Sequence, residues 1–379
     1  MRILILSNSI GSLINFRYEL LQALVERGDE VFLASQIEAE ASPKVLIDLG
    51  CKFIETEMNQ RGTNPIDELK LINTYNKIIG KVHPSIVIAY TIKPNIYGSV
   101  ACRRMGVPVI ANVTGLGMAL DHSGILQRIT VWLYRWGFKR TDYVFFQNEE
   151  NRDFFKKHKI RAKAQSVIHG SGVNLDKFHF IEYPTDNGEL YFLYVGRILS
   201  MKGMKQLIDA AMYFQESQSK VRFHIVGIKE DPYYTQLILE LDKKGVLKYH
   251  GKQSDIRPFI QKAHCLVHPS YYPEGLSNVC LEASAMGRPV ITTDKSGCKE
   301  TVDNGVTGYI VKQKDSQDLI DKIEQFVNLP YKKKAEMGWN AHQKVSEQFN
   351  RVDVVKKYLE IIDALVQKTT AMRINNTKQ

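Results

Sequence analysis

The order of apolar and helical segments between residues 264 and 291 places the strongest constraint on the fold. Residues 265–267 form an apolar run closed by a proline, which is typical of a buried strand. After a loop that holds Gly275, apolar residues recur at helical spacing over 276–286. Residues 288–291 then begin a second strand pattern. Strand, loop, helix and strand in this order predict half of a parallel α/β sheet.

The same alternation runs through the whole chain. The apolar runs that we predict to be strands are 2–6, 30–34, 52–55, 85–89, 107–113, 143–147, 190–195, 222–226 and 265–267. The loop after the first run holds one glycine, Gly11, so the glycine fingerprint of a dinucleotide-binding domain is absent. The pattern therefore predicts Rossmann-like parallel sheets with helices on both faces, and it argues against a dehydrogenase.

The chain of 379 residues is long enough for two domains. The alternation breaks over 178–189, where proline, asparagine and glycine cluster as in a linker. We therefore predict one Rossmann-like domain over 1–180 and a second over 181–350. The remainder, 351–379, is predicted to be a helix with a frayed end from 371 onward.

Composition places the chain among globular proteins, because 44% of its residues are hydrophobic and 24% are charged. The formal net charge of +10 predicts an anionic partner, which can be a nucleotide, a phospholipid surface or a nucleic acid. Basic and aromatic residues do not interleave in an RNA-binding pattern, and the sequence has neither a helix-turn-helix nor a zinc-finger signature. A nucleic-acid partner is therefore not expected.

The cysteines and the first residues indicate a cytoplasmic protein. Five cysteines are an odd number without metal-ligand spacing, which is typical of reduced thiols in a chain of this size. The apolar run at the start is too short for a signal peptide, and no stretch reaches the ~18 apolar residues of a membrane-spanning helix. Any membrane contact is therefore expected to be peripheral.

Residues 124–163 carry most of the excess positive charge. Ten basic residues stand against four acidic ones in this segment, so its net charge is near +6. Trp132, Trp136 and Phe138 alternate with basic residues such as Arg135, which is typical of an amphipathic helix that binds an anionic membrane surface. The equally supported alternative is a helix that faces the core and leaves its basic side chains in solvent.

Two glutamates flank the predicted helix start that follows residues 265–267. Glu274 lies in the loop at the carboxyl end of a strand, and Glu282 lies inside the helix. Between them, the backbone N–H groups of Gly275, Leu276 and Ser277 are predicted to open the helix. A helix start carries partial positive charge and free donors, so it suits a diphosphate, and a glycine there lets the ligand approach the backbone. The alternative is an ordinary strand–helix unit with two solvated glutamates.

The loop after 190–195 places an arginine and a lysine close together, in the pattern Gly196-Arg197-x4-Lys202-Gly203. An arginine fork matches phosphate oxygens, and a nearby lysine adds a point charge. The two cations are therefore candidates for a phosphate site, although two surface cations would give the same pattern.

The Glu-x7-Glu spacing belongs to a wider pattern, with Pro-Ser upstream at 269–270 and Ala-x-x-x-Gly-x-Pro-Val downstream at 283–290. It continues through Gly297 and Glu300 to 304–308. This pattern resembles the donor site of retaining GT-B glycosyltransferases, the glycogen-synthase-like family also called glycosyltransferase family 4. The resemblance implies a GT-B fold, in which two Rossmann-like α/β domains face each other across a cleft and the last helix crosses back to the first domain.

The resemblance also implies a reaction: transfer of a sugar from a nucleoside diphosphate sugar, with UDP as the expected nucleotide and with retention at the anomeric carbon. Negative charge then develops on the β-phosphate, and donors placed there lower the barrier. Arg197, Lys202 and the helix start at 275–277 would supply these donors. The sequence has no Asp-x-Asp motif, so we expect neither a metal nor a cofactor.

Individual donor residues receive roles from the same resemblance. Glu282 would hold the ribose hydroxyls. Glu274 would contact sugar hydroxyls, and the alternative is a nucleophile like the carboxylate of some retaining glycosidases. Gly11, Gly196 and Gly227 would lie against the donor.

Two blocks of the first domain, Lys93-Pro-Asn and Thr114-Gly-Leu-Gly, are similar to sugar transferases that elongate lipid-linked bacterial oligosaccharides. The similarity implies a polyprenyl-diphosphate-linked acceptor and transfer of a hexose or N-acetylhexosamine. The candidate acceptor or sugar-proximal residues are Ser12, Arg17, Lys93 and Thr114. Close relatives carry a histidine just before this lysine, and Ile92 stands there, so a histidine contact to the sugar is not expected. For Lys93 the alternative is a solvated loop residue.

The predicted function is thus sugar transfer in bacterial surface polysaccharide or glycan synthesis, at the inner face of the cell membrane. Two alternatives are a nucleotide-sugar epimerase of the same fold and a non-catalytic, membrane-associated scaffold. An epimerase would lack the Glu-x7-Glu pattern. Against a scaffold stand the four intact charged residues Arg197, Lys202, Glu274 and Glu282.

Overall fold

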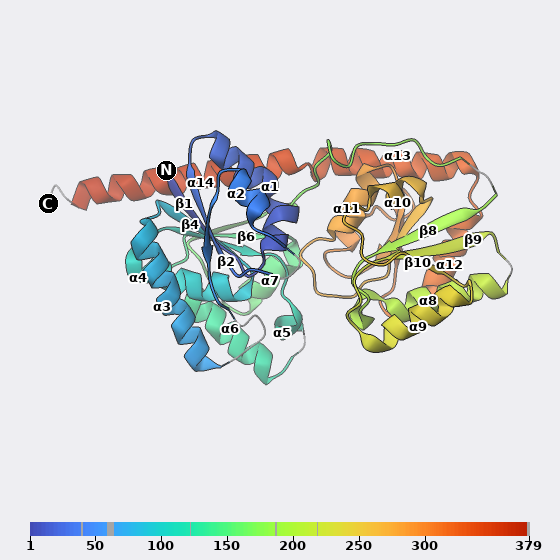
Figure 1. The fold of residues 1–379 in the computed structure, drawn as a ribbon, viewed down its shortest axis with the longest axis horizontal. Coiled ribbons are helices and arrows are strands. Elements are labelled where there is room, and N and C mark those ends of the chain that lie inside the picture. The colour runs from blue at the N-terminus through green and yellow to red at the C-terminus, as the bar shows by residue number, and fades with distance from the viewer. Residues whose placement is uncertain (39–40, 59–63, 122, 186–187, 218, 377–379) are drawn as a thin grey trace. The chain divides into compact units, whose positions relative to one another are not determined.

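The computed structural model describes residues 1–379 apart from 39–40, 59–63, 122, 186–187, 218 and 377–379 (Figure 1). The chain divides into two compact units. The first comprises Met1–Ser171 and Arg351–Gln379, and the second comprises Gly172–Asn350. Each unit holds one parallel sheet with hydrophobic clusters on both of its faces.

The first unit is built on a seven-stranded sheet in the order β3-β2-β1-β4-β5-β6-β7, and all neighbouring strands are parallel. The strands are β1 Arg2–Leu6, β2 Glu30–Ser35, β3 Lys52–Glu55, β4 Ile86–Tyr90, β5 Val109–Val113, β6 Tyr143–Phe146 and β7 Ala164–Val167. The first six lie within two residues of the predicted runs. The seventh was not predicted, because Ala-Gln-Ser-Val at the edge of a sheet is not an apolar run.

Helices cover both faces of this sheet (Figure 1). Leu4 and Leu6 point to the cluster under α3, α4 and α6, whereas Ile3 and Ile5 point to the cluster under α1 and α14, as the alternation of a strand requires. The helices are α1 Ile10–Glu26, α2 Lys44–Asp48, α3 Pro65–Val82, α4 Ser99–Met105, α5 Met118–Asp121, α6 Ile125–Phe138, α7 Glu149–Lys157 and α14 Arg351–Asn376, with a π-helical turn η1 Pro94–Gly98 before α4.

The last helix, α14, belongs to the first unit. Tyr358 is buried in the cluster under α1, and Arg351 pairs with Glu19 of α1 at 2.8 Å. The helix continues to Asn376, so the predicted frayed end from 371 is wrong up to that residue.

The second unit has a six-stranded parallel sheet in the order β10-β9-β8-β11-β12-β13. The strands are β8 Leu190–Val195, β9 Val221–Val226, β10 Lys248–Tyr249, β11 Cys265–His268, β12 Val290–Thr293 and β13 Gly308–Val311. We did not predict β13, which starts directly at the last glycine of the 304–308 block. Gly308 has no room for a side chain, since a Cβ would lie 1.8 Å from the carbonyl oxygen of Val290 on the neighbouring strand.

Two helices of the second unit begin at an aspartate cap. Asp231 accepts hydrogen bonds from the amides of Tyr233 and Tyr234, and Asp315 accepts one from the amide of Asp318. The helices are α8 Met204–Glu216, α9 Pro232–Lys243, α10 Arg257–Lys262, α11 Asn278–Ala285, α12 Ser316–Val327 and α13 Tyr331–Gln348, with short 3₁₀ turns η2 Ser200–Lys202 and η3 Lys299–Thr301.

The chain passes between the units at 171/172, earlier than the predicted boundary at 180/181. The amide of Val173 donates to the carbonyl of Phe349 at 2.8 Å, and the hydroxyl of Tyr183 donates to the carbonyl of His264 at 2.9 Å. The predicted linker over 178–189 is therefore wrong in its first part, because those residues pack on the second unit. Two of its residues, 186 and 187, lie outside the described residues.

Candidate functional site

The predicted catalytic residues gather at the carboxyl edge of the second sheet. Strands β8 and β11 are parallel neighbours, so the loops that follow them lie at the same edge. The first loop carries Arg197 and Lys202, and the second carries Glu274. The structure thus brings these three residues together within one unit.

Lys202 forms an ion pair with Glu274, although we predicted a phosphate contact for the lysine and a sugar contact for the glutamate. The lysine is 8% exposed, and burial lowers the pKa of Lys202 to about 8. A buried ammonium group needs an anionic partner, and Glu274 provides one here. An anionic ligand that displaced Glu274 would therefore find a positive charge already in place.

Arg197 and Tyr272 complete this cluster. Arg197 Nη1 lies 3.0 Å from Glu230 Oε2. The Arg197 guanidinium carbon lies 4.9 Å from the ring centre of Tyr272, and Lys202 Nζ lies 5.3 Å from the same ring. The negative face of an aromatic ring attracts cations, so Tyr272 stabilises both charges. Neither Tyr272 nor Glu230 was predicted, because the sequence around each gives only a loop signal.

Glycines hold the loops of this edge in contact. A Cβ on Gly227, after β9, would lie 1.7 Å from the carbonyl oxygen of Gly196. Gly203 has φ +78, and a Cβ there would lie 2.2 Å from the carbonyl oxygen of Pro269. Any side chain at Gly227 or Gly203 would separate the loops. Contact of Gly196 and Gly227 with a donor stays a prediction.

The predicted helix start at 275–277 is wrong. Helix α11 begins at Asn278, with Ser277 as its N-cap. The amide of Ser277 donates to the carbonyl of Gly297 at 2.6 Å, and the side chain of Leu276 is buried in the core. An anion at this helix start would meet the amides of 278–280. Contact of Gly275, Leu276 and Ser277 with a donor stays a prediction.

A second loop supports the loop of Glu274. Gly297 has φ +92, and a Cβ there would lie 3.0 Å from the carbonyl oxygen of Glu274 and 3.1 Å from that of Gly275. Glu300 accepts a hydrogen bond from the amide of Gly297 at 2.7 Å and one from the hydroxyl of Ser296 at 3.0 Å. The motif residues Gly297 and Glu300 thus position the Glu274 loop.

Two polar side chains near the start of α11 differ in burial. Ser277 is buried, and its hydroxyl finds no hydrogen-bond partner within the described part of the chain. Glu282 lies about one turn into α11 and is only partly buried. Its contact with a ribose stays a prediction.

Gly11 and Ser12 lie in the first turn of α1, in the first unit. Ser9 caps this helix and accepts from the amide of Ser12 at 3.0 Å. The carboxylate of Glu38 accepts from the amide of Gly11 at 3.0 Å. A ligand that used the Gly11 amide would therefore have to displace Glu38.

Arg17 of α1 is a buried cation with few polar contacts. It is 5% exposed, its guanidinium carbon lies 4.7 Å from the ring centre of Tyr90, and it donates to the carbonyl of Phe16 at 3.3 Å. Among the described residues, no carboxylate pairs with Arg17. A buried charge is costly unless an anion or a ring compensates it, so Arg17 is a candidate anion-binding residue.

Lys93 and Thr114 follow the neighbouring strands β4 and β5. Lys93 pairs with Glu68 of α3, and both side chains are mostly buried, so the alternative of a solvated loop lysine is wrong. Thr91 has φ +72, which is uncommon for a β-branched residue. Ile92 packs against the core, so this position offers no polar replacement for a histidine.

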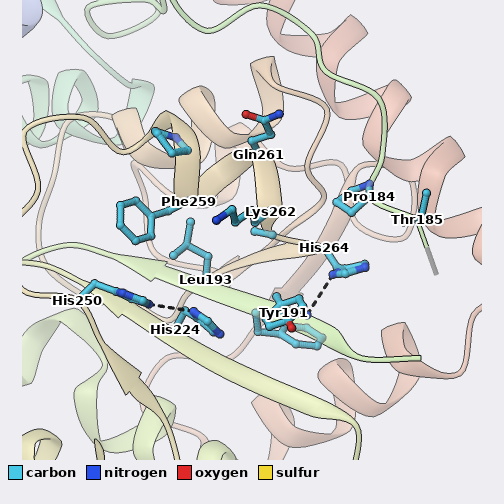
Figure 2. Close-up of a pocket in the computed structure, with 13 residues that line it drawn as sticks. Pro184, Thr185, Tyr191, Leu193, His224, His250, Phe259, Gln261, Lys262 and His264 are labelled. Carbon is cyan, nitrogen blue, oxygen red and sulfur yellow. Dashed lines mark hydrogen bonds between the residues drawn. The ribbon is translucent and has the colours of Figure 1, made fainter. Parts of the chain in front are cut away.

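A separate pocket of about 670 Å³ lies beneath α10 in the second unit (Figure 2). The Nδ1 of His224 and the Nε2 of His250 are 2.9 Å apart in its wall, and Tyr191 and Phe259 add aromatic faces. Burial lowers the pKa of His224 to about 4. The loops after β8 and β11 do not line this pocket, so it is not part of the candidate site.

Over the described residues, no three or more His, Cys, Asp or Glu residues are grouped to hold a metal ion. None of the described helices is long and apolar enough to cross a membrane. All five cysteines are buried free thiols.

Two family models match the chain one after the other. Residues 2–148 match the glycosyl transferase 4-like family, and residues 176–344 match glycosyl transferases group 1. A capsular polysaccharide biosynthesis glycosyltransferase, CapM of Staphylococcus aureus, is 33% identical over 307 residues, which cover 75% of this chain and 77% of that protein. The chain belongs to the group 1 glycosyl transferases.

This glycosyl transferase has further relatives over nearly its whole length. The N,N'-diacetylbacillosaminyl-diphospho-undecaprenol alpha-1,3-N-acetylgalactosaminyltransferase of Campylobacter jejuni is 29% identical over 384 residues, covering 97% of this chain and 100% of that one. The crystal structure of Anabaena Alr3699/HepE in complex with UDP and glucose has a TM-score of 0.78 at 19% identity, covering 96% of this chain and 100% of that one. The fold of this glycosyl transferase is GT-B, which confirms the expected fold class.

Proposed function

We propose that this glycosyl transferase moves a sugar from a UDP-sugar to a saccharide linked to polyprenyl diphosphate, with retention at the anomeric carbon. The observation that carries the proposal is the cationic cluster after β8, in which buried Lys202 pairs with Glu274 beside Arg197 and Tyr272. The name of the Campylobacter jejuni relative supports a lipid-diphosphate-linked acceptor, and the UDP and glucose in the HepE structure support a UDP-linked donor.

In this proposal the leaving diphosphate takes the place of Glu274. Departure of the nucleotide builds negative charge on the β-phosphate, and a buried ammonium stabilises that charge more than water does. Lys202 exchanges its carboxylate partner for the phosphate, while Glu274 turns to the hydroxyls of the donor sugar. Arg197 adds a second positive charge, so no divalent metal is needed.

Glu274 acts in binding rather than as a nucleophile in this scheme. Once the phosphate has replaced it on Lys202, Glu274 accepts hydrogen bonds from the hydroxyls of the donor sugar and does not attack the anomeric carbon. The acceptor hydroxyl attacks the anomeric carbon from the face that the diphosphate leaves. The bond to the acceptor oxygen forms as the bond to the phosphate oxygen breaks, and the departing phosphate takes the hydroxyl proton. This route retains the anomeric configuration.

Arg17 is proposed to bind the diphosphate of the acceptor. It is buried on the ring of Tyr90, and no carboxylate among the described residues neutralises it. A guanidinium fork matches phosphate oxygens in geometry and charge. A lipid diphosphate would therefore supply the anion that this part of the first unit lacks.

Helix α6 is proposed to contact the membrane. Ile125 and Trp132 are 77% and 61% exposed, and they lie at the spacing that puts them on one helix face. Arg128 and Arg135 are exposed nearby, so this face combines apolar and basic groups, as an anionic surface requires. Phe138 does not contribute, because it is buried in the core, and its assignment to the membrane face was wrong.

The start of α3 also exposes aliphatic side chains. Ile66 and Leu69 are largely exposed there. In Figure 1, α3 and α6 both begin on the lower side of the first unit. The proposal therefore predicts that aliphatic residues from both helix starts enter the lipid headgroup region.

A transfer assay tests the proposed function. Purified protein is incubated with polyprenyl-diphosphate-linked saccharides and a panel of labelled UDP-hexoses and UDP-N-acetylhexosamines. The proposal predicts that label from one UDP-sugar moves into the lipid fraction. Conversion of a UDP-sugar into a different UDP-sugar without acceptor would instead identify an epimerase. Absence of transfer from every UDP-sugar would contradict the proposed donor class.

A further inference from the structure

A polar cleft of about 1110 Å³ lies wholly within the first unit. Residues at and after the ends of β2 and β3 form its floor, α3 forms a wall with residues between 67 and 77, and Lys93 lies at its border after β4. Apart from Lys93, no residue of this cleft was singled out from the sequence. Because it lies at the carboxyl edge of a parallel sheet, it occupies a position where such folds bind ligands.

The cleft contains a buried hydroxyl without a partner. Thr56 is 1% exposed, and its Oγ1 finds no hydrogen-bond partner within the described residues. Thr91, two residues before Lys93, also has a hydroxyl without a partner among the described residues and has φ +72, but it does not line the cleft. Orphaned buried hydroxyls cost free energy, and strained backbone is concentrated at functional sites. In the cleft itself, the orphaned hydroxyl of Thr56 points to a ligand that completes the hydrogen bonding.

The charge of the cleft excludes a diphosphate as its natural occupant. Four carboxylates and three ammonium groups line it, and one pair of them, Glu68 and Lys93, is already joined. A diphosphate would meet more negative than positive groups there. A neutral ligand with many hydroxyls suits the cleft, since each hydroxyl can donate to a carboxylate and accept from an amide or ammonium group. Met58 and Leu71 offer apolar contacts for the C–H faces of a sugar ring.

We propose that this cleft binds the saccharide part of the acceptor while the acceptor's diphosphate stays outside it. The inference rests on the proposed function, because it takes the acceptor to be a saccharide. The hydroxyl of Thr56 and the side chains of Asn73 and Lys77 bind sugar hydroxyls. The stacking partner of Arg17, Tyr90, is three residues before Lys93, so the end of β4 connects the anion site proposed at Arg17 with this cleft.

Two variants and one matched control test the cleft. Thr56→Val keeps the shape of the side chain and removes the orphaned hydroxyl, so the folded protein should be as stable as the parent or more stable. Asn73→Ala changes an exposed side chain of α3 and should fold normally. Thr141→Val is the control, because Thr141 is also 1% exposed with an orphaned hydroxyl but does not line the cleft.

The readout is saturation-transfer NMR with glucose, galactose, N-acetylglucosamine and N-acetylgalactosamine as probes. At least one sugar should give a signal in the parent and in Thr141→Val that falls severalfold in Thr56→Val and Asn73→Ala. Pyrophosphate should not displace it. Sugar signals that are equal in all four proteins, or a sugar that pyrophosphate competes away, would overturn the inference.

The transfer assay separates this inference from the proposed function. With an active acceptor, Thr56→Val should raise the acceptor KM about tenfold, the loss of one good hydrogen bond, and leave the donor KM unchanged. Transfer with parental acceptor KM in both Thr56→Val and Asn73→Ala would overturn the cleft assignment alone. Absence of transfer in the parent would overturn the proposed function, while the NMR result would still decide whether the cleft binds sugars.

Discussion

Burial and the neighbouring charges have opposite effects on the pKa of Lys202. Burial favours the neutral amine and lowers its pKa, while the Glu274 carboxylate and the ring of Tyr272 favour the ammonium. The lysine is therefore held close to the point where it changes charge. A ligand that brings two negative charges to this position would shift that balance strongly toward the ammonium.

Removing either cation of the cluster should slow turnover more than it weakens donor binding. Lys202→Ala and Arg197→Ala should each lower kcat by about 100-fold, because their charge matters most as the phosphate departs. Steady-state kinetics with a matched change of an exposed lysine, Lys205→Ala, provide the comparison. A folded Lys202→Ala variant with near-parental kcat would refute the assigned role.

The two glutamates should differ in their effect on the nucleotide. Glu282→Ala should weaken UDP about tenfold, through loss of charge-assisted hydrogen bonds to the ribose. Glu274→Gln should leave UDP affinity unchanged or raise it, because it removes the carboxylate that competes with the phosphate for Lys202. Calorimetric titration with UDP measures both. An equal loss of affinity in the two variants would merge the roles that we distinguish.

Donor binding should depend on the protonation of Lys202. The pKa of this lysine is about 8 without ligand, so the ammonium is lost as pH rises through that value. A bound diphosphate raises the pKa of Lys202, so at a pH above about 8 the lysine takes up a proton when UDP binds. In that pH range the UDP affinity should fall by up to about tenfold per pH unit. Calorimetry from about pH 7 to about pH 9, in buffers of different ionisation enthalpy, detects the uptake.

Lys202→Arg is the control for that titration, since arginine stays protonated over the whole range. Its UDP affinity should be independent of pH. If the UDP affinity of the parent is also independent of pH, the lysine does not titrate in this range, and the proposed balance of burial and charge at Lys202 is incorrect.

The two faces of α6 have different environments, because one packs in the core and the other is exposed. Its inner face, with Val131, Tyr134 and Phe138, packs in the core, while Ile125, Leu126, Ile129 and Trp132 face outward. Packing of the inner face therefore stabilises the helix. Changes on the outer face should affect surface binding without unfolding the unit.

Membrane binding should require both parts of that outer face. A double variant, Ile129→Ser with Trp132→Ser, should bind anionic liposomes more weakly because it loses apolar contacts. A triple variant in which Glu replaces Arg135, Lys139 and Arg140 should lose the preference for anionic lipid. Cosedimentation at low and high salt measures this, with Tyr233→Ser, an exposed aromatic of the second unit, as the control. Equal binding of the parent to neutral and anionic liposomes would remove the membrane contact.

The sequence predicted elements well where their signal is local. Strands such as β1 and β4 are continuous apolar runs, and their bounds followed from that pattern. The polar edge strand β7 has no such pattern, because pairing with β6 defines it. The start of α11 was misplaced for a similar reason: the amide of Ser277 bonds to Gly297, twenty residues later in the chain. Only tertiary contacts decide such boundaries.

Over the whole molecule, the sequence identified the candidate residues but not the pairs they form. The motifs pointed to Lys202 and Glu274 separately, and the fold joins them. The stacking of Arg17 on Tyr90 and the orphaned hydroxyl of Thr56 depend on contacts between β-strands and helices that carry no local sequence signature. The residues of the proposed acceptor site were therefore less accessible from the sequence than those of the proposed donor site.

The measurement that tests this account most directly is a single-turnover transfer reaction in EDTA, with the anomeric configuration of the product determined by NMR. Under single-turnover conditions the measured rate does not include product release, which can depend on metal even when the chemical step does not. If Arg197 and Lys202 supply the charge for the departing diphosphate, the parent enzyme should transfer the sugar at its full rate in EDTA, and the product should have the configuration of the donor. A chemical step that needs added Mn²⁺ or Mg²⁺, or a product of inverted configuration, would contradict it.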